Sequence, residues 1–265
     1  MDMVHAFWLA FIQGVTEFLP ISSSGHLALV PSVFGWPDQG RAFDVAVHVG
    51  TLAAVLIYFR SDIRLILRDW IGSMTSGVST VYSKLAWSIV FATLLVGIAG
   101  VIFEMFYSTM VRNPMSIAIA TIVFGILLGA ADILGSKQRS IDSITWCDVL
   151  VIGAAQVLAL IPGTSRSGIT ISAGLMMGLS RDAAARFSFL MAIPVITLAG
   201  AWETMGLART DDPVNWPVLG FGVLVSAVVA LACIHYFLRY LQRFSLMPFV
   251  VYRLILGVIL LAMFM

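Results

Sequence analysis

The stretch QGVTEFLPISSSGH at residues 13–26 places ionisable and hydroxyl side chains within otherwise apolar sequence. Gln13 and Glu17 are separated by one helical turn, so both side chains can reach the same object. A carboxylate beside an amide oxygen suits a hard divalent cation such as Mg²⁺ or Ca²⁺. The alternative is a buried carboxylate that only pairs with an arginine.

Three serines and a histidine follow this carboxylate. Ser22, Ser23 and Ser24 can each cap the next helix, and the same hydroxyls can bind an anion. His26 stands three residues after Ser23, so a helical turn would bring imidazole and hydroxyl together. That pair suits a nucleophile with its general base, or a histidine that itself attacks or delivers a proton.

A second polar stretch, PGTSRSGIT at residues 162–170, has the composition of a phosphate site. Proline and glycine permit a turn, and the N–H groups at a helix start form a cradle for an anion. Arg166 adds a planar donor that can bind two oxygens at once. The segment lacks the lysine and the glycine spacing of a Walker loop.

The composition indicates an integral membrane protein. Of 265 residues, 60% are hydrophobic and 11% are charged, whereas a soluble domain has about 25% charged residues. The net charge of +1 and the lack of a basic tail argue against nucleic acid as a partner. The N-terminus has an acid where a signal peptide has basic residues, so we expect it to be retained. Cys147 and Cys233 have no metal-like spacing and are interpreted as packing residues.

Six runs with few acidic or basic residues, whose ends are allowed to slip by a few positions, are long enough to span a bilayer as helices. They cover residues 43–59, 85–104, 115–134, 187–206, 214–238 and 246–265. Residues 3–34 and 147–179 are also apolar, but proline, glycine and hydroxyl residues interrupt each of them. Because a broken helix frees backbone groups that hydrocarbon cannot satisfy, we expect two re-entrant hairpins whose tips are buried in protein.

The chain is therefore predicted to be one all-α polytopic membrane domain, residues 1–265, built from two repeats. Residues 1–134 and 135–265 each contain a re-entrant hairpin followed by three spans. Three spans change sides, so the second repeat is inverted relative to the first. Such inverted-topology repeats place their site near the middle of the bilayer.

The distribution of basic residues gives the orientation. With the N-terminus outside, ten basic residues lie inside, three lie outside, and Arg166 and Arg253 lie within the membrane. The inside residues are Arg60, Arg64, Arg68, Lys84, Lys137, Arg139, Arg181, Arg186, Arg239 and Arg243, and the outside ones are Arg41, Arg112 and Arg209. The positive-inside rule then favours both termini outside. The two tips would meet in the membrane with Glu17 beside Arg166. The inside loop at residues 60–84 includes the amphipathic stretch RSDIRLILRDW, which would lie along the membrane surface.

The segments EFLPISSSGH and PGTSRSGIT, in this order, closely resemble those of the bacterial undecaprenyl-diphosphate phosphatases, the bacitracin resistance protein family. The similarity covers the whole chain, including the order of the spans. It implies removal of the terminal phosphate from undecaprenyl diphosphate at the outer, periplasmic face of the cytoplasmic (inner) membrane. The monophosphate product is the lipid carrier that is reused for peptidoglycan synthesis.

The resemblance also implies roles for individual residues. The glutamate-rich motif of the family falls on Gln13 and Glu17, although many relatives have an acid at the position of Gln13. The resemblance implies dependence on a divalent cation, with Glu17 as the best ligand. The candidate catalytic residues are Glu17, Ser23, His26 and Arg166, the candidate phosphate ligands are Ser22, Ser24, Gly163, Thr164, Ser165, Ser167 and Thr170, and the candidate metal ligands are Glu17 and Gln13.

Three chemical routes and one rival function remain open at this stage. Ser23 can attack with His26 as its base, His26 can attack directly, or His26 can activate water. A lipid flippase or transporter is the rival, because broken helices at the midplane are also typical of transporters. His48 is interpreted as a pore-facing or packing residue. The expected partner is a polyprenyl diphosphate in the membrane, and the sequence permits a homodimer without requiring one.

Overall fold

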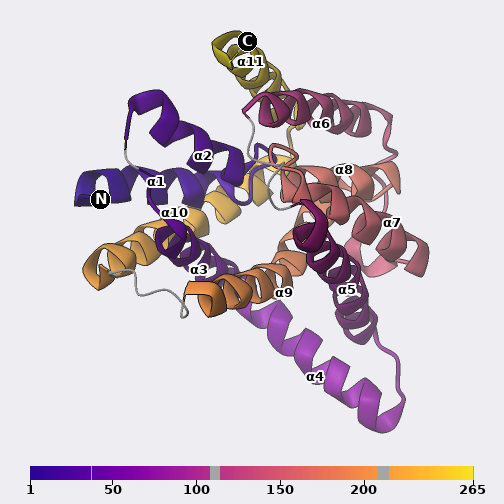
Figure 1. Ribbon diagram of the computed structural model, residues 1–265. Coiled ribbons are helices and arrows are strands. Elements are labelled where there is room, and N and C mark those ends of the chain that lie inside the picture. The colour runs from indigo at the N-terminus through magenta and orange to yellow at the C-terminus, as the bar shows by residue number, and fades with distance from the viewer. Residues whose placement is uncertain (37, 108–113, 208–214, 265) are drawn as a thin grey trace.

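The computed structural model describes residues 1–36, 38–107, 114–207 and 215–264. Within these ranges the regular secondary structure is entirely helical (Figure 1). The helices are α1 (Met3–Thr16), α2 (Ser23–Phe34), α3 (Arg41–Tyr58), α4 (Arg60–Ser76), α5 (Val81–Tyr107), α6 (Pro114–Leu134), η1 (Ile141–Ser143), α7 (Trp146–Val157), η2 (Leu158–Leu160), α8 (Arg166–Met176), α9 (Arg181–Leu207), α10 (Trp216–Leu241) and α11 (Met247–Phe264).

Six helices are long and apolar enough to cross a membrane, namely α3, α5, α6, α9, α10 and α11. They coincide with the six predicted spans, which are thereby confirmed as long apolar helices. The helix α9 begins at Arg181 rather than at residue 187. The predicted span starts after Arg186 and so leaves out this charged first turn. Asp182 and Arg186 form an ion pair one turn apart at 2.8 Å, and such a pair is compatible with a helix.

The remaining apolar helices form two hairpins that are broken where the sequence changes from apolar to hydroxyl-rich. In the first hairpin α1 and α2 are joined by residues 17–22, and in the second α7 and η2 are joined to α8 by residues 161–165. The longest of these apolar helices is Trp146–Leu160, formed by α7 with 12 residues and η2 with 3, so 15 residues in all. It extends only about 23 Å, less than the hydrocarbon core of about 30 Å. The Ser167 hydroxyl donates to the Leu19 carbonyl at 2.9 Å, so the two tips touch.

Close helix packing surrounds these hairpins. The helix α3 lies along α10 at Gly50, where a Cβ atom would collide with the Val223 carbonyl and with Ser226. Glycine is therefore required for this approach of two backbones. The helix α6 packs along α11, and α1 packs against α10, so the first hairpin is held between helices from both halves of the chain.

One polar cluster joins the ends of three helices. The Asp132 carboxylate at the end of α6 accepts from Arg181 Nε at 2.5 Å and from the backbone N–H of Leu246 at 3.0 Å. These groups begin α9 and precede α11. The end of α6 and the starts of α9 and α11 therefore lie at the same end of the molecule.

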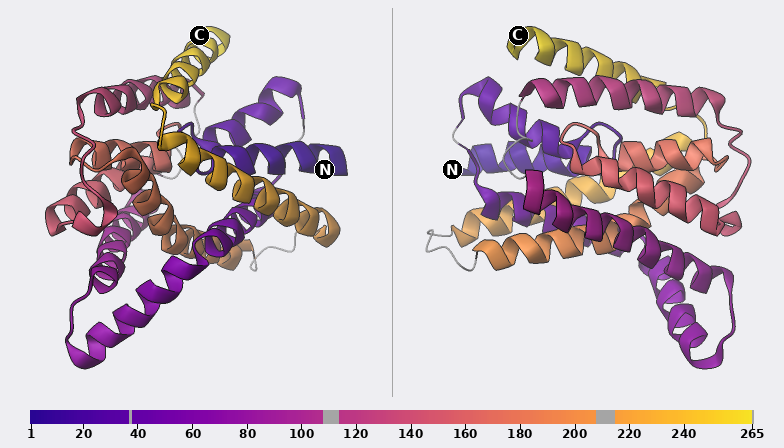
Figure 2. Two further views of the ribbon diagram at one scale, coloured as in Figure 1. Left: turned by 180° about the vertical axis from the view of Figure 1, so that it is seen from behind. Right: turned by 45° about the vertical axis from the view of Figure 1, so that its right-hand side comes forward.

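The helix α4 and the start of α5 project away from the other helices (Figures 1 and 2). The apolar side chains of Leu67, Ile71 and Met74 are 47, 56 and 53% exposed. Arginines lie on the same helix, as expected for an amphipathic segment. The predicted amphipathic stretch RSDIRLILRDW thus lies on α4, and the predicted inside loop at residues 60–84 consists of α4 and the turn into α5.

Candidate active site

The carboxylate of Glu17 is the centre of the polar cluster between the two tips. It follows directly after the last residue of α1. Its Oε1 accepts from Arg166 Nη2 at 3.0 Å, and its Oε2 accepts from Gln13 Nε2 at 3.0 Å and from Ser23 Oγ at 2.7 Å. The predicted Glu17–Arg166 pair and the predicted proximity of Gln13 to Glu17 are both present.

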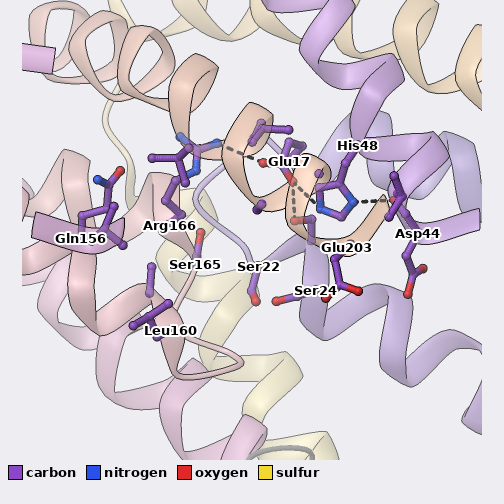
Figure 3. A pocket seen from close by; sticks show the side chains of 18 of the residues that line it. Glu17, Ser22, Ser24, Asp44, His48, Gln156, Leu160, Ser165, Arg166 and Glu203 are labelled. Atoms are coloured by element: carbon purple, nitrogen blue, oxygen red, sulfur yellow. Dashed lines mark hydrogen bonds and ion pairs between the residues drawn. The ribbon is translucent and has the colours of Figure 1, made fainter. Parts of the chain in front are cut away.

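His48 of α3 is a functional candidate that the sequence did not single out. Its Nε2 lies 3.7 Å from Glu17 Oε2, and its Nδ1 lies 2.7 Å from the carbonyl oxygen of Asp44. A carbonyl only accepts hydrogen bonds, so Nδ1 carries a hydrogen and Nε2 is the nitrogen left to face the carboxylate. Figure 3 shows Glu17 between Arg166 and His48.

The structure does not join Ser23 to His26. His26 Nδ1 lies 2.7 Å from the Ser22 carbonyl oxygen and Nε2 lies 2.6 Å from the Tyr252 hydroxyl, whose ring stacks on the imidazole. Ser23 instead donates to Glu17. The spacing of three residues was compatible with a Ser23–His26 contact, but both ring nitrogens of His26 have other partners.

The two serines that begin the returning helices adopt the same unusual backbone conformation. Ser22 has φ of 73° and Ser165 has φ of 71°, a region that residues other than glycine rarely enter. Each hydroxyl accepts from the N–H three residues later, from Gly25 at 3.4 Å and from Gly168 at 3.2 Å. Both serines therefore act as helix N-caps, and the tips store backbone strain of the kind found at functional sites.

A cavity of about 340 Å³ opens onto Glu17 and Arg166 (Figure 3). Its polar wall contains Ser22, Ser23, Ser24, His48, Gln156 and Ser165, and its mouth includes Arg41, Asp44 and Glu203. Its apolar wall consists of Val45, Val96, Ala159, Leu160, Val195, Ile196, Ala199 and Gly200. One pocket thus combines a polar end with a hydrocarbon-lined side.

Several predicted phosphate ligands lie behind this cavity rather than on its wall. Gly163, Thr164, Ser167 and Thr170 are absent from its lining. The Thr170 hydroxyl contacts the Arg166 carbonyl at 2.8 Å and the Ser188 hydroxyl at 2.7 Å. Thr170 is therefore placed to brace the residue that carries the guanidinium, and Ser167 to link the tips.

Arg253, which the sequence left without a partner, lies on α11 with its side chain fully buried. It donates to carbonyl oxygens of both tips, those of Pro20, Gly163 and Thr164. An arginine in an apolar run signals an unusual partner, but the sequence does not reveal that the partners are backbone carbonyls.

The donors present fit a divalent cation only if substrate and water complete its coordination. The described residues contain no group of three or more histidines, cysteines or acids that could hold a metal. Glu17 is the carboxylate that lies beside Arg166 on the cavity wall, and behind it the Oε1 atom of Gln13 is buried without a hydrogen-bond partner. One carboxylate with substrate phosphates and waters is a coordination that Mg²⁺ commonly accepts.

Six apolar helices around a buried carboxylate and arginine define a multi-pass membrane protein with a polar site enclosed among its helices. The family described as bacitracin resistance protein BacA matches residues 6–259. An undecaprenyl-diphosphatase of Nitrosococcus oceani is 53% identical over 264 residues, which cover 100% of each chain. The undecaprenyl-diphosphatase of Thioalkalivibrio sulfidiphilus is 52% identical over 265 residues, again 100% of each. Undecaprenyl-diphosphatase 2 of Stutzerimonas stutzeri is 51% identical over 267 residues, 100% of this chain and 99% of the relative. The chain belongs to the bacitracin resistance protein BacA family.

Proposed function

We propose that this membrane protein is a phosphatase that hydrolyses undecaprenyl diphosphate to undecaprenyl phosphate and inorganic phosphate. The observation that carries the proposal is the Glu17 carboxylate held between Arg166 and Ser23 at the wall of a half-apolar cavity. Full-length relatives at about half identity bear the name of this activity. The reaction would return the lipid carrier to peptidoglycan synthesis and give resistance to bacitracin.

The shape of the cavity fits a lipid diphosphate. Alanine and branched side chains of η2, α5 and α9 line one side and offer a surface for the first isoprene units. Arg166 and the start of α8 stand at the polar end, where a guanidinium and helix N–H groups favour phosphate oxygens. The diphosphate is thus expected to lie between the tips while the lipid tail extends sideways among the helices.

Two inverted repeats and an N-out, C-out orientation in the bacterial inner membrane complete the proposal. Each half contains one broken hairpin and three long apolar helices. In this orientation the start of α3 and the end of α9 lie outside. Arg41, Asp44 and Glu203 occupy those ends and line the cavity mouth, which supports a site that opens to the outer side.

Phosphoryl transfer demands neutralisation of charge on the transferred group and alignment of the nucleophile. Arg166 supplies positive charge. Ser23 is the nucleophile that the geometry supports best, because its hydroxyl already donates to Glu17 Oε2, which is placed to take the proton. The new bond joins Ser23 Oγ to the terminal phosphorus, and the electron pair of the broken bond leaves with the lipid monophosphate. Water then releases phosphate from the serine, or attacks directly in place of Ser23.

A divalent cation, when bound, would be held by Glu17 with Gln13 behind it and would neutralise phosphate charge. Gln13 has no charge of its own, so its role is to hold Glu17 through the 3.0 Å hydrogen bond. His26 is assigned a supporting role, since it holds the Ser22 carbonyl on one side and Tyr252 on the other.

The deciding experiment is phosphate release from a polyprenyl diphosphate by detergent-purified protein, with and without chelator, beside Arg166→Ala. Arg68→Ala on the projecting helix α4 is the matched control, because its side chain is 71% exposed far from the tips. We expect release that needs a divalent cation, is lost in Arg166→Ala and is kept in Arg68→Ala. Absence of release by folded wild-type protein with any divalent cation would refute the assignment.

Lipid transport is the second candidate function. The observation that favours it is the pair of broken helices whose tips meet, an arrangement that transporters use to bind and move substrates. Passage of an anion does not need a serine hydroxyl that donates a hydrogen bond to a carboxylate, as Ser23 does to Glu17. We therefore prefer hydrolysis as the function. Flipping of a fluorescent polyprenyl phosphate in vesicles by protein that releases no phosphate would favour transport.

A further inference from the structure

Arg253 of α11 joins the two broken tips through backbone carbonyls. Its Nε donates to the Thr121 carbonyl at 3.1 Å, and its Nη1 donates to Pro20 at 3.2 Å and to Thr164 at 2.9 Å. Its Nη2 donates to the Gly163 carbonyl at 2.9 Å. One guanidinium therefore holds α6, the first tip and the second tip at once.

The charge of this arginine is balanced in an unusual way. Among the described residues, no carboxylate forms an ion pair with Arg253. A buried cation without such a partner is costly unless its donors are satisfied. Broken helices leave carbonyls without intrahelical partners, and these carbonyls are equally costly in an apolar surrounding. The guanidinium and the two tips therefore satisfy one another.

Two glycines leave the space that the arginine occupies. A Cβ atom at Gly125 of α6 would lie 3.1 Å from Arg253 Cβ, and one at Gly168 of α8 would lie 3.1 Å from Nη1. Both contacts would be tight. Both α6 and α8 therefore approach the arginine closely at a glycine, where a larger residue would press on its side chain.

The carbonyls that Arg253 holds lie close in sequence to residues of the cavity wall. Thr164 precedes Ser165, and Pro20 stands two residues before Ser22. The peptide between Thr164 and Ser165 is trans, so the Ser165 N–H points opposite to the carbonyl and away from Arg253. A strong bond at the carbonyl also polarises the peptide and strengthens that N–H as a donor.

We propose that Arg253 is a positioning residue, whose guanidinium fixes both tips and thereby aims their N–H and hydroxyl groups at the phosphate of the substrate. The inference rests on the proposed phosphatase function. Arg253 does not contact the cavity itself. Its effect on turnover is transmitted through the carbonyls of Pro20, Gly163 and Thr164.

The test compares kcat and KM for phosphate release by Arg253→Met and Arg253→Lys with wild type. Methionine keeps an unbranched chain without donors, and lysine keeps the charge but lacks the planar fork. Misplacement of reacting groups by about 1 Å costs about 100-fold in rate. We therefore expect kcat of Arg253→Met to fall about 100-fold with little change in KM, and Arg253→Lys to retain more activity.

Arg181→Met is the matched control. It removes another arginine that pins helices together, through Asp132 at the end of α6 and away from the cavity. We expect Arg181→Met to lower the unfolding temperature while kcat per folded molecule stays at the wild-type value. Activities are compared well below the unfolding temperature of the weakest variant, and Arg253→Lys decides alone if Arg253→Met does not fold.

Chemical rescue gives a readout that a purely structural role would not move. Guanidinium chloride at low millimolar concentration should restore kcat of Arg253→Ala, and sodium chloride at the same concentration should not. Two results would each overturn this inference and leave the proposed function standing. One is an equal response of Arg253→Ala to the two salts, and the other is a kcat of the folded Arg253 variants equal to that of Arg181→Met. Wild-type protein without phosphatase activity would overturn the proposed function, and this inference with it.

Discussion

At the scale of single residues, Glu17 is the group on which most contacts of the site converge. Arg166, Gln13 and Ser23 all donate to its two oxygens. In Glu17→Gln, one of these positions becomes an amide NH₂ that faces another donor. We expect phosphate release to fall about 100- to 10,000-fold, the range for loss of a general base, because the amide can no longer take the Ser23 proton.

The comparison for this first prediction is Gln13→Ala, measured in the same phosphate-release assay. Gln13 only supports the carboxylate, so its loss should cost far less than the loss of the Glu17 charge. Circular dichroism checks that both variants are folded. Turnover of Glu17→Gln within tenfold of wild type would contradict the role given to the carboxylate.

His48 provides the second prediction. Its Nε2 faces Glu17 Oε2 at 3.7 Å, and Nδ1 is fixed by the Asp44 carbonyl. Replacement by alanine should lower kcat about 100-fold, the lower end of the range for one group that assists proton transfer. His5→Ala, at an N-terminal histidine outside the cavity lining, should match wild type. Equal kcat values for the two variants would remove His48 from the site.

The residue scale also shows which parts of the site the sequence could predict. The pairing of Glu17 with Arg166 followed from the cost of isolated charge in a membrane, which requires a partner for each. The facing of His48 toward Glu17 did not follow, because it depends on how α3 is rotated against the first tip. Likewise, the partners of Arg253 are carbonyls, which every residue has and no sequence pattern marks.

At the scale of elements, α7 begins at a buried acid that should control local stability. The Asp148 side chain is fully buried and accepts from Arg139 Nη2 at 2.6 Å and Nη1 at 2.9 Å. It also completes a capping box with Thr145. These bonds with the carboxylate raise the pKa of Arg139 above its ordinary value. The start of the second hairpin is therefore tied to the loop that follows α6.

The third prediction concerns Asp148→Ala. Removing one partner of a buried pair leaves the other charge uncompensated and costs about 3 kcal/mol. We expect a lower unfolding temperature in detergent and a normal kcat for the protein that remains folded, because Asp148 lies outside the cavity lining. Asp142→Ala, in the exposed η1 turn, is the control and should leave the unfolding temperature unchanged.

The elements themselves were the most predictable part of the structure. Long apolar runs with few charges located all six long apolar helices, since the bilayer penalises charge within a span. Breaks at proline, glycine and serine located both tips. The boundaries were less certain, as the charged first turn of α9 shows, because side chains at a membrane edge can be solvated while the backbone stays helical.

At the scale of the whole molecule, charge and structure give the same division into two ends. The Asp132 cluster gathers the end of α6 and the starts of α9 and α11, and its arginine is one of the ten basic residues expected inside. The cavity mouth gathers the start of α3 and the end of α9, which are expected outside. Chain direction alone makes these two ends opposite, since α9 runs from one to the other.

The fourth prediction tests that orientation in intact bacterial cells with a membrane-impermeant maleimide. Native Cys147 is exposed at the start of α7, which the orientation places inside. It should react only after the cells are permeabilised. Gln39→Cys, before α3 and combined with Cys147→Ser and Cys233→Ser, should react in intact cells. The reverse pattern would place the cavity mouth on the inner face, where a phosphatase would meet a different pool of lipid diphosphate, so the outcome decides which leaflet supplies the substrate.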